Sequence, residues 1–326
     1  MAMKWDDLFS KGSVVDLSTS LWRARVQLKA DDLGIEDSDE VRKALSLGCH
    51  RLAPAKAFEG LLAPARQAKK LIDYYSVNFG LIRGARFVPN KNVGALLKDL
   101  KEQRTLFRAA VDQFVQSYEA TKDEMLPVIE KALRDAARTP EAAAKAFRRI
   151  RAEYPPASDI WGRFDLSWSI YTITAPSNKE AAEAMSDESG NVKGIVRSMV
   201  EQIRTEMSEK IGDLLSLAGK GGKLSERSIR SATELLDRLD NLNVFGDAAL
   251  EMQIRTVRSW ISGLEGGKAT DGFITGITEV RKSLEEGLED AVKSAEESLT
   301  GLGRRKLSNG STKKPVEAAP LFPVEV

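Results

Sequence analysis

Apolar residues recur at three- and four-residue spacing along two stretches in the first half of the chain, residues 54–79 and residues 93–133. Residues with this spacing share one face of an α-helix, so each stretch is predicted to bury an apolar stripe. Residues 80–89 between them contain two glycines and a proline, which are typical of a turn. We therefore predict a long antiparallel helical hairpin, with Pro127 kinking or dividing its second helix.

The helical period continues through the second half of the chain. Helices are predicted over residues 195–215, 225–239 and 250–261, and a glycine-rich stretch follows at residues 263–276. The last periodic segment is acidic, because residues 277–303 contain seven carboxylate side chains and three basic ones. A bundle of amphipathic helices is therefore expected in this half.

Alternation of apolar and polar residues, which indicates a half-buried strand, occurs twice. Residues 14–28 alternate with a change of face partway, and residues 164–174 place Phe164, Leu166 and Trp168 on one side. A two-stranded ribbon is only marginally stable in water. We therefore expect the two strands to pair with each other and to lie against helices.

Together these patterns predict a mainly α fold, with a long antiparallel helical hairpin, a helical bundle and a small two-stranded β element. Residues 1–13 are expected to form an N-terminal extension, and residues 14–264 an elongated helical body. Residues 265–303 supply a glycine-rich linker and the acidic amphipathic helix. Residues 304–326 show almost no periodicity and are expected to form a disordered tail.

Composition and charge narrow the functional class. The 326-residue chain is 42% hydrophobic and 30% charged, which is the balance of a globular protein. Its 49 basic and 48 acidic residues leave a formal charge of +1, so no global field favours nucleic acid or an anionic membrane. The first ten residues carry charges before any apolar run, and no segment approaches the roughly 20 apolar residues that span a bilayer. A cytoplasmic location without membrane binding is expected.

The sequence contains no recognisable catalytic motif. Residues 219–223 superficially resemble a phosphate-binding loop, but Leu217 and Leu224 occupy the positions of its first glycine and its hydroxyl residue. The single cysteine, Cys49, and the single histidine, His50, cannot form an internal disulfide or a four-ligand zinc site. As neighbours in sequence these two residues need not face each other. We therefore predict no enzymatic activity, cofactor or metal.

Local basic groups are the candidates for contact with a polyanion. Thr139 and Pro140 predict the start of a short basic helix, as its N-cap and its first residue. The candidate side chains are four from this helix and two from the hairpin turn: Lys145, Arg148, Arg149, Arg151, Arg83 and Arg86. Arg138 would extend the ridge on the helix, and Phe87 would offer a ring for base stacking. The alternative is that all these charges belong to ordinary solvated faces.

The end of the tail is a second candidate contact. Residues 320–324 form an apolar cluster, and Leu321 and Phe322 are candidates for docking as an extended peptide. The alternative is a frayed chain end without a binding role.

Several short segments, taken together in their order along the chain, resemble those of a known protein family. They are residues 17–34, the turn at 79–89, Tyr154-Pro155-Pro156 before the strand at 164–173, residues 224–228 and residues 243–247. This order resembles one family of phage and prophage proteins, domain of unknown function family 3150. The resemblance covers about residues 14–264 and leaves the acidic helix and the tail outside.

The resemblance implies partners rather than an activity, since the family has no assigned catalytic residues. Its members are often encoded beside a MoxR or cobalt-chelatase-like AAA+ ATPase and a von Willebrand A domain protein. By this analogy, the chain would be a non-catalytic accessory or adaptor of an AAA+ ATPase assembly in the cytoplasm of a bacterial host. The alternative is a nucleic-acid-associated phage factor that binds through its basic groups. Imperfect heptads leave coiled-coil self-association open without specifying a stoichiometry.

Overall fold

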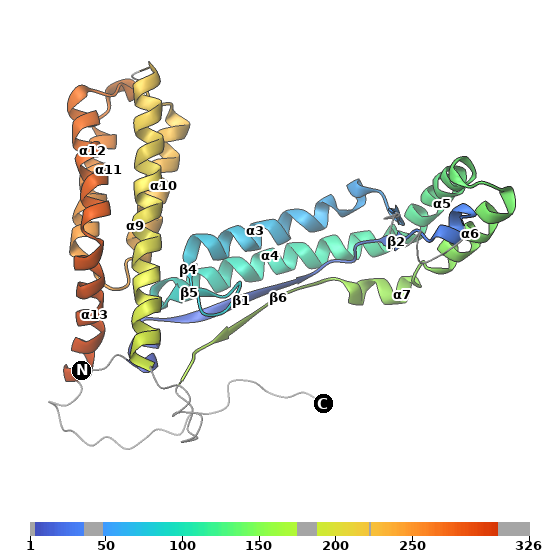
Figure 1. The fold of residues 1–326 in the computed structure, drawn as a ribbon, viewed down its shortest axis with the longest axis horizontal. Helices are drawn as coiled ribbons and strands as arrows, with labels where there is room; N and C mark the ends of the chain where they lie inside the picture. The colour runs from blue at the N-terminus through green and yellow to red at the C-terminus, as the bar shows by residue number, and fades with distance from the viewer. Residues whose placement is uncertain (1–3, 36–47, 175–187, 222, 306–326) are drawn as a thin grey trace. The chain divides into compact units, whose positions relative to one another are not determined.

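The computed structural model describes residues 4–35, 48–174, 188–221 and 223–305. Contacts divide the chain into two compact units. Unit 1 comprises Met1–Lys11, Ile173–Leu236 and Asn243–Val326, and unit 2 comprises Gly12–Thr172 and Asp237–Leu242. The described parts of both units are predominantly helical, which confirms a mainly α fold (Figure 1). The unit boundaries differ from the sequence-based division, because the chain leaves unit 1 after Lys11 and returns to it at Ile173.

Unit 2 contains an antiparallel sheet with the strand order β4-β5-β1-β6. The strands are β1 (Gly12–Ser20), β4 (Val77–Asn78), β5 (Arg86–Pro89) and β6 (Asp165–Tyr171). In the register of β1 and β6, Val14 lies opposite Tyr171 and Ser20 lies opposite Asp165. The predicted pairing of two sequence-distant strands is therefore confirmed. The sheet is larger than predicted, because the end of the first predicted helical stretch forms β4 and the predicted turn contributes β5.

Residues 14–28 do not form one continuous strand. After β1 the chain is irregular from Leu21 to Ala24, and β2 (Arg25–Gln27) then pairs with β3 (Cys49–Arg51) in a separate two-stranded ribbon. Ala24 adopts a left-handed backbone conformation, with φ of 46°. This break allows the chain to leave the main sheet and begin the second ribbon.

The helices of unit 2 include the predicted hairpin. Helices α3 (Glu59–Tyr75) and α4 (Asn90–Gln116) lie side by side along the sheet (Figure 1). The second stretch is divided at Ser117, where α4 ends and α5 (Tyr118–Ala136) begins, and Pro127 lies inside α5. Pro127 is exposed, so the carbonyl group that loses its N–H partner can bind water. The remaining elements are η1 (Ala30–Leu33), η2 (Ala55–Phe58), α6 (Pro140–Ala152), α7 (Ala157–Ile160) and η3 (Trp161–Arg163).

The core of unit 2 lies between the α3–α4 pair and the sheet. Leu96, Leu100 and Phe107 of α4 are buried together with Leu61 and Ile72 of α3. At three- and four-residue spacing, these side chains form the stripe that the sequence predicted. Further buried members of the cluster come from the sheet and the later helices: Val15, Val88, Ile129, Leu133, Ile150 and Leu166.

Unit 1 is built around α9 (Glu188–Gly221), which packs against α12 (Asp271–Glu286) and α13 (Leu288–Arg305). The unit also contains α1 (Trp5–Phe9), α10 (Glu226–Leu242) up to Leu236, α11 (Ala248–Ser262) and η4 (Glu265–Gly267). Trp5 and Leu8 of α1 are buried, and α1 contacts α9 and α13. The described part of residues 1–13 therefore contributes to the core of unit 1 up to Lys11, instead of forming a peripheral extension.

The acidic segment is two helices instead of one. Thr270 caps α12, its Oγ1 accepting a hydrogen bond from the Phe273 N–H at 3.2 Å. Residues 271–276 of the expected glycine-rich stretch are consequently helical. Gly276, inside α12, lies so close to α11 that an added Cβ would come within 2.4 Å of the Trp260 ring. Gly287 separates α12 from α13. Of the predicted tail, residues 304–305 belong to α13, while Leu321 and Phe322 lie outside the described residues.

A buried ion pair holds the start of α11 in unit 1. The guanidinium of Arg204 donates to Asp247 Oδ2 from Nε at 3.0 Å and from Nη2 at 2.7 Å, and Nη1 donates to the Leu284 carbonyl at 3.2 Å. Asp247 Oδ1 accepts from the Leu250 N–H at 3.0 Å and so caps α11. Asn243 Oδ1 accepts from the Asp247 N–H at 2.9 Å. Residues 243–247, one of the segments that carry the family resemblance, thus shape the entry into this helix.

Candidate functional site

The α5–α6 corner is fixed by local hydrogen bonds. Thr139 Oγ1 accepts from the Ala142 N–H at 3.2 Å, and Pro140 occupies the first position of α6, which confirms the predicted start of the basic helix. The Arg138 N–H donates to the Leu33 carbonyl at 3.1 Å and ties the corner to η1. The backbone here is therefore held independently of any ligand.

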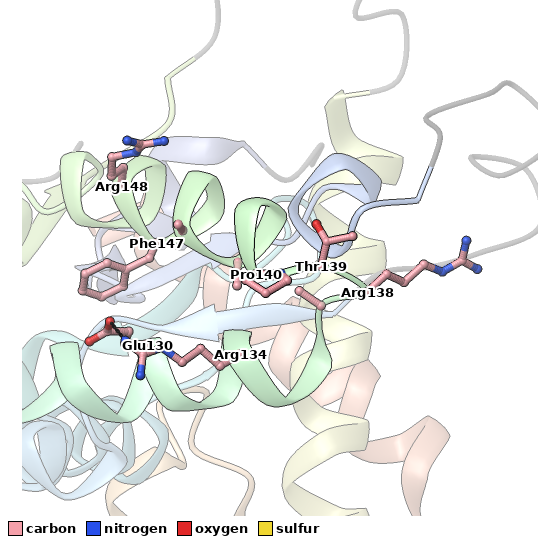
Figure 2. A pocket seen from close by; sticks show the side chains of 10 residues that line it. Glu130, Arg134, Arg138, Thr139, Pro140, Phe147 and Arg148 are labelled. Carbon is pink, nitrogen blue, oxygen red and sulfur yellow. Dashed lines mark hydrogen bonds and ion pairs between the residues drawn. The ribbon is translucent and has the colours of Figure 1, made fainter.

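A cavity of about 600 Å³ opens between the two helices, and we call it the α5–α6 cleft. Figure 2 shows the Phe147 ring directed into the space between α5 and α6, while Arg138 and Arg148 project outward at the rim. The cleft is lined by Glu130, Arg134, Ala137, Arg138, Thr139, Pro140, Ala143, Ala144, Phe147 and Arg148. It therefore combines an apolar floor with a charged rim.

The rim of the cleft is positively charged. Arg134 Nη2 lies 2.5 Å from Glu130 Oε1, but this pair is exposed, so it contributes little to stability (Figure 2). Arg138 and Arg148 form no side-chain ion pair or hydrogen bond with any other described residue. Two uncompensated guanidinium groups thus remain beside an apolar surface, an arrangement suited to a ligand with both carboxylate and apolar groups.

The opposite face of α6 is engaged within unit 2. Arg149 donates to both carboxylate oxygens of Asp32 in η1, with Nε 2.9 Å from Oδ1, and it also donates to the Gln27 carbonyl at 3.3 Å. Lys145 Nζ lies 2.6 Å from Asp31 Oδ2 in a more exposed pair. The predicted basic ridge is therefore divided, since Lys145 and Arg149 bind η1 whereas Arg148 lies at the rim of the cleft.

The carboxylate of Asp32 is stabilised in its charged form. Burial by itself would raise the pKa of Asp32, but hydrogen bonds from Arg149 and from the Lys29 N–H at 2.7 Å outweigh it, so the pKa lies below its ordinary value of 3.8. The Arg149–Asp32 contact thus positions α6 against η1. The Arg149 guanidinium is therefore not free to bind a polyanion without breaking this contact.

The basic residues at the hairpin turn are also separated. Arg86 in β5 forms an ion pair with Asp73 of α3, while Arg83 is exposed in the turn between β4 and β5. Phe87 is fully buried in the core, with 0% exposure. The structure thus removes the expected stacking surface, because the Phe87 ring cannot reach a base.

The sequence did not single out Glu130, Arg134 or Phe147 as site residues. Phe147 lies next to the buried stripe of α6, directly after Ala146, and is itself only partly buried. Phe147 packs against the core of unit 2 and also lines the cleft, and its position in the stripe of α6 did not distinguish these two roles. The cleft also depends on the angle between two helices, and spacing within one helix cannot reveal that angle.

Within the described ranges, no group of three or more His, Cys, Asp and Glu side chains is placed to hold a metal ion. Cys49 is exposed in β3. Among the helices that the structure describes, none combines the length and the hydropathy needed to cross a membrane.

Comparison with known proteins places the chain in a family. Neither a curated protein nor a solved structure matches it. The sequence profile of the family described as "Protein of unknown function (DUF3150)" matches residues 10–286. The match is longer than the resemblance indicated, because it includes α12, which had been expected to lie outside. Since most of the chain is covered, the protein belongs to the DUF3150 family of proteins of unknown function.

Proposed function

We propose that the chain is a non-catalytic adaptor that binds an acidic, amphipathic segment of a protein partner in the α5–α6 cleft. The observation that supports this proposal is the Phe147 ring inside the cleft, together with Arg138 and Arg148, which also line the cleft and project outward at its rim without an ion-pair partner among the described residues. Aromatic and arginine side chains supply a large share of the binding energy at protein interfaces. An apolar side chain of the partner would fill the cleft, and neighbouring carboxylates would pair with the rim.

The partner that we propose is an AAA+ ATPase or a von Willebrand A domain protein, because members of the family that the sequence resembles are often encoded beside such proteins. The adaptor would hold the ATPase or its client through surface recognition, without a reaction of its own. The α5–α6 corner supports this role, because hydrogen bonds of Thr139 and of the Arg138 backbone hold it in place before a partner binds. A preformed surface loses little conformational entropy on association.

The experiment uses the full chain and a purified AAA+ ATPase of the proposed class from the same source, with and without ATP. The double variant Arg138→Glu/Arg148→Glu should lower the affinity at least tenfold, equivalent to about 1.4 kcal/mol. The matched control Arg83→Glu/Arg151→Glu changes the net charge equally at exposed arginines outside the cleft lining. It should leave the affinity within about twofold of the wild type, equivalent to about 0.4 kcal/mol. Absence of binding by the wild type, or equal losses in the two variants, would contradict the proposal.

Nucleic-acid binding is the second candidate, and the charge arrangement supports it less. Asp31 and Asp32 already neutralise Lys145 and Arg149 within unit 2. Titration of the chain with a labelled oligonucleotide at several salt concentrations tests it. A steep salt dependence that becomes shallower in Arg148→Glu would favour nucleic acid over the acidic segment.

A further inference from the structure

The β2–β3 ribbon of unit 2 places two arginines directly opposite each other. In its register, Arg25 faces Arg51. The Leu52 N–H donates to the Ala24 carbonyl at 2.7 Å, and the Leu28 N–H donates to the Gly48 carbonyl at 3.0 Å. Because hydrogen-bonded and non-hydrogen-bonded pairs alternate along antiparallel strands, Arg25 and Arg51 occupy a non-hydrogen-bonded pair, where facing side chains approach most closely.

This arrangement is unfavourable for the isolated ribbon. Like charges directly opposite each other on one face of a sheet destabilise it. Arg23, Arg25 and Arg51 are exposed, and none of them forms an ion pair or side-chain hydrogen bond with another described residue. All three line one cavity of about 360 Å³, and none of the residues lining that cavity is acidic.

The backbone at this cavity is also strained. Ala24, between Arg23 and Arg25, has φ of 46° and is the one non-glycine residue with positive φ in the part of the chain that the structure describes. Left-handed conformations are disfavoured for residues with a Cβ, and those that persist cluster at ligand sites. The buried Ala24 is held in place by the hydrogen bond from Leu52.

Two aromatic rings that line the cavity belong to a larger aromatic cluster. The Trp22 ring contacts the rings of Phe58, Phe114 and Tyr118 edge to face, at centroid distances of 6.4, 6.2 and 5.9 Å. The Tyr118 hydroxyl donates to the Pro155 carbonyl at 2.7 Å. Trp22 and Phe58 line the cavity and are partly exposed, so they present a fixed apolar surface beside the arginines.

We propose that this cavity binds a small organic polyphosphate, with its phosphates on Arg23, Arg25 and Arg51 and its apolar part against Trp22 and Phe58. Three guanidinium groups require a ligand with more than one negative charge, and phosphate oxygens accept bidentate bonds from arginine. The cavity volume is at the lower end of the range for small-molecule sites. The site is separate from the α5–α6 cleft and does not depend on the function proposed for that cleft.

Calorimetric titration of the full chain with ATP, inorganic triphosphate and adenosine tests the proposal. ATP should bind saturably at one site, triphosphate more weakly because it lacks the apolar part, and adenosine not measurably. The double variant Arg25→Gln/Arg51→Gln should lower the affinity for ATP at least tenfold. The control Arg83→Gln/Arg151→Gln removes the same charge from exposed positions outside the cavity lining and should bind ATP as the wild type does.

Circular dichroism of both double variants should show that each is folded, since the substituted side chains are exposed. Three results would overturn the proposal. They are the absence of saturable binding of ATP and triphosphate to the wild type, equal ATP affinity in the Arg25→Gln/Arg51→Gln variant and the wild type, and equal losses in that variant and the control.

Discussion

Replacement of Arg204 by methionine isolates the contribution of the buried ion pair in unit 1. The side chains of Arg204 and Asp247 are only 4% and 7% exposed. Methionine replaces the unbranched aliphatic stem of arginine with an unbranched apolar side chain, but it has no positive charge. It leaves the Asp247 carboxylate buried without its ion-pair partner, although the carboxylate still caps α11 through the Leu250 N–H.

The magnitude follows from the burial of both charges. Removal of one partner from a buried ion pair costs about 3–5 kcal/mol, because the remaining charge is desolvated without compensation. An exposed pair, such as Arg255 with Glu251, contributes about 0.2–1 kcal/mol, and these two side chains are 73% and 42% exposed. Arg204→Met should therefore lower the free energy of unfolding several times more than the control Arg255→Met.

Urea unfolding followed by circular dichroism measures both variants. A third variant, Arg204→Met/Asp247→Ser, removes both charges and retains a hydroxyl that can cap α11. It should be more stable than Arg204→Met alone, since no buried charge is left unpaired. If Arg204→Met costs no more than Arg255→Met, or if the double variant is the least stable, the reasoning about the buried pair is refuted.

Three further predictions concern particular contacts. Gly276→Ala should destabilise unit 1 by about 1–3 kcal/mol, because the added Cβ would overlap the Trp260 ring. The control Gly194→Ala, in open space on α9, should stabilise unit 1 by up to about 1 kcal/mol, and thermal unfolding compares the two variants. Because the pKa of Asp32 is lowered in the folded protein, its contribution to the free energy of unfolding is fully present above pH 3.8 and is lost as the pH falls through the lowered pKa. Asp32→Asn should therefore be less stable than the wild type near neutral pH. Urea titrations at several pH values should show this difference in stability shrinking in acid. Arg51→Gln should raise the free energy of unfolding by about 0.2–1 kcal/mol in the absence of ligand by removing the like-charge pair, and a decrease would contradict that pairing.

The long elements could be predicted from the sequence because each contains enough residues to show a helical or a strand period. The stripes of α3, α4 and α9 each repeat over several turns, and β1 and β6 alternate over enough residues to indicate a face. Strands β4 and β5 contain two and four residues, too few to show a period. Their place in the sheet depends on the pairing of β5 with β1, which joins residues more than seventy positions apart and buries Phe87.

The site could be predicted only in part. Spacing identified the basic residues of α6, but the binding of Arg149 to Asp32 joins residues 117 positions apart and depends on tertiary packing. The division of this helix into an η1 face and a cleft face follows from that contact. Likewise, the facing of Arg25 and Arg51 depends on the register of a short ribbon, which the sequence pattern does not specify.

Site-specific photocrosslinking from the α5–α6 cleft tests the adaptor proposal most directly. A photoreactive residue at Ala144, which is exposed in the cleft lining, is compared with the same residue at Ala109, exposed on α4. In a mixture with the AAA+ ATPase proposed as partner, crosslinks from position 144 should map by mass spectrometry to one acidic segment of that protein. Crosslinks that are absent at 144, or that are equally frequent at 109, would contradict binding in the cleft.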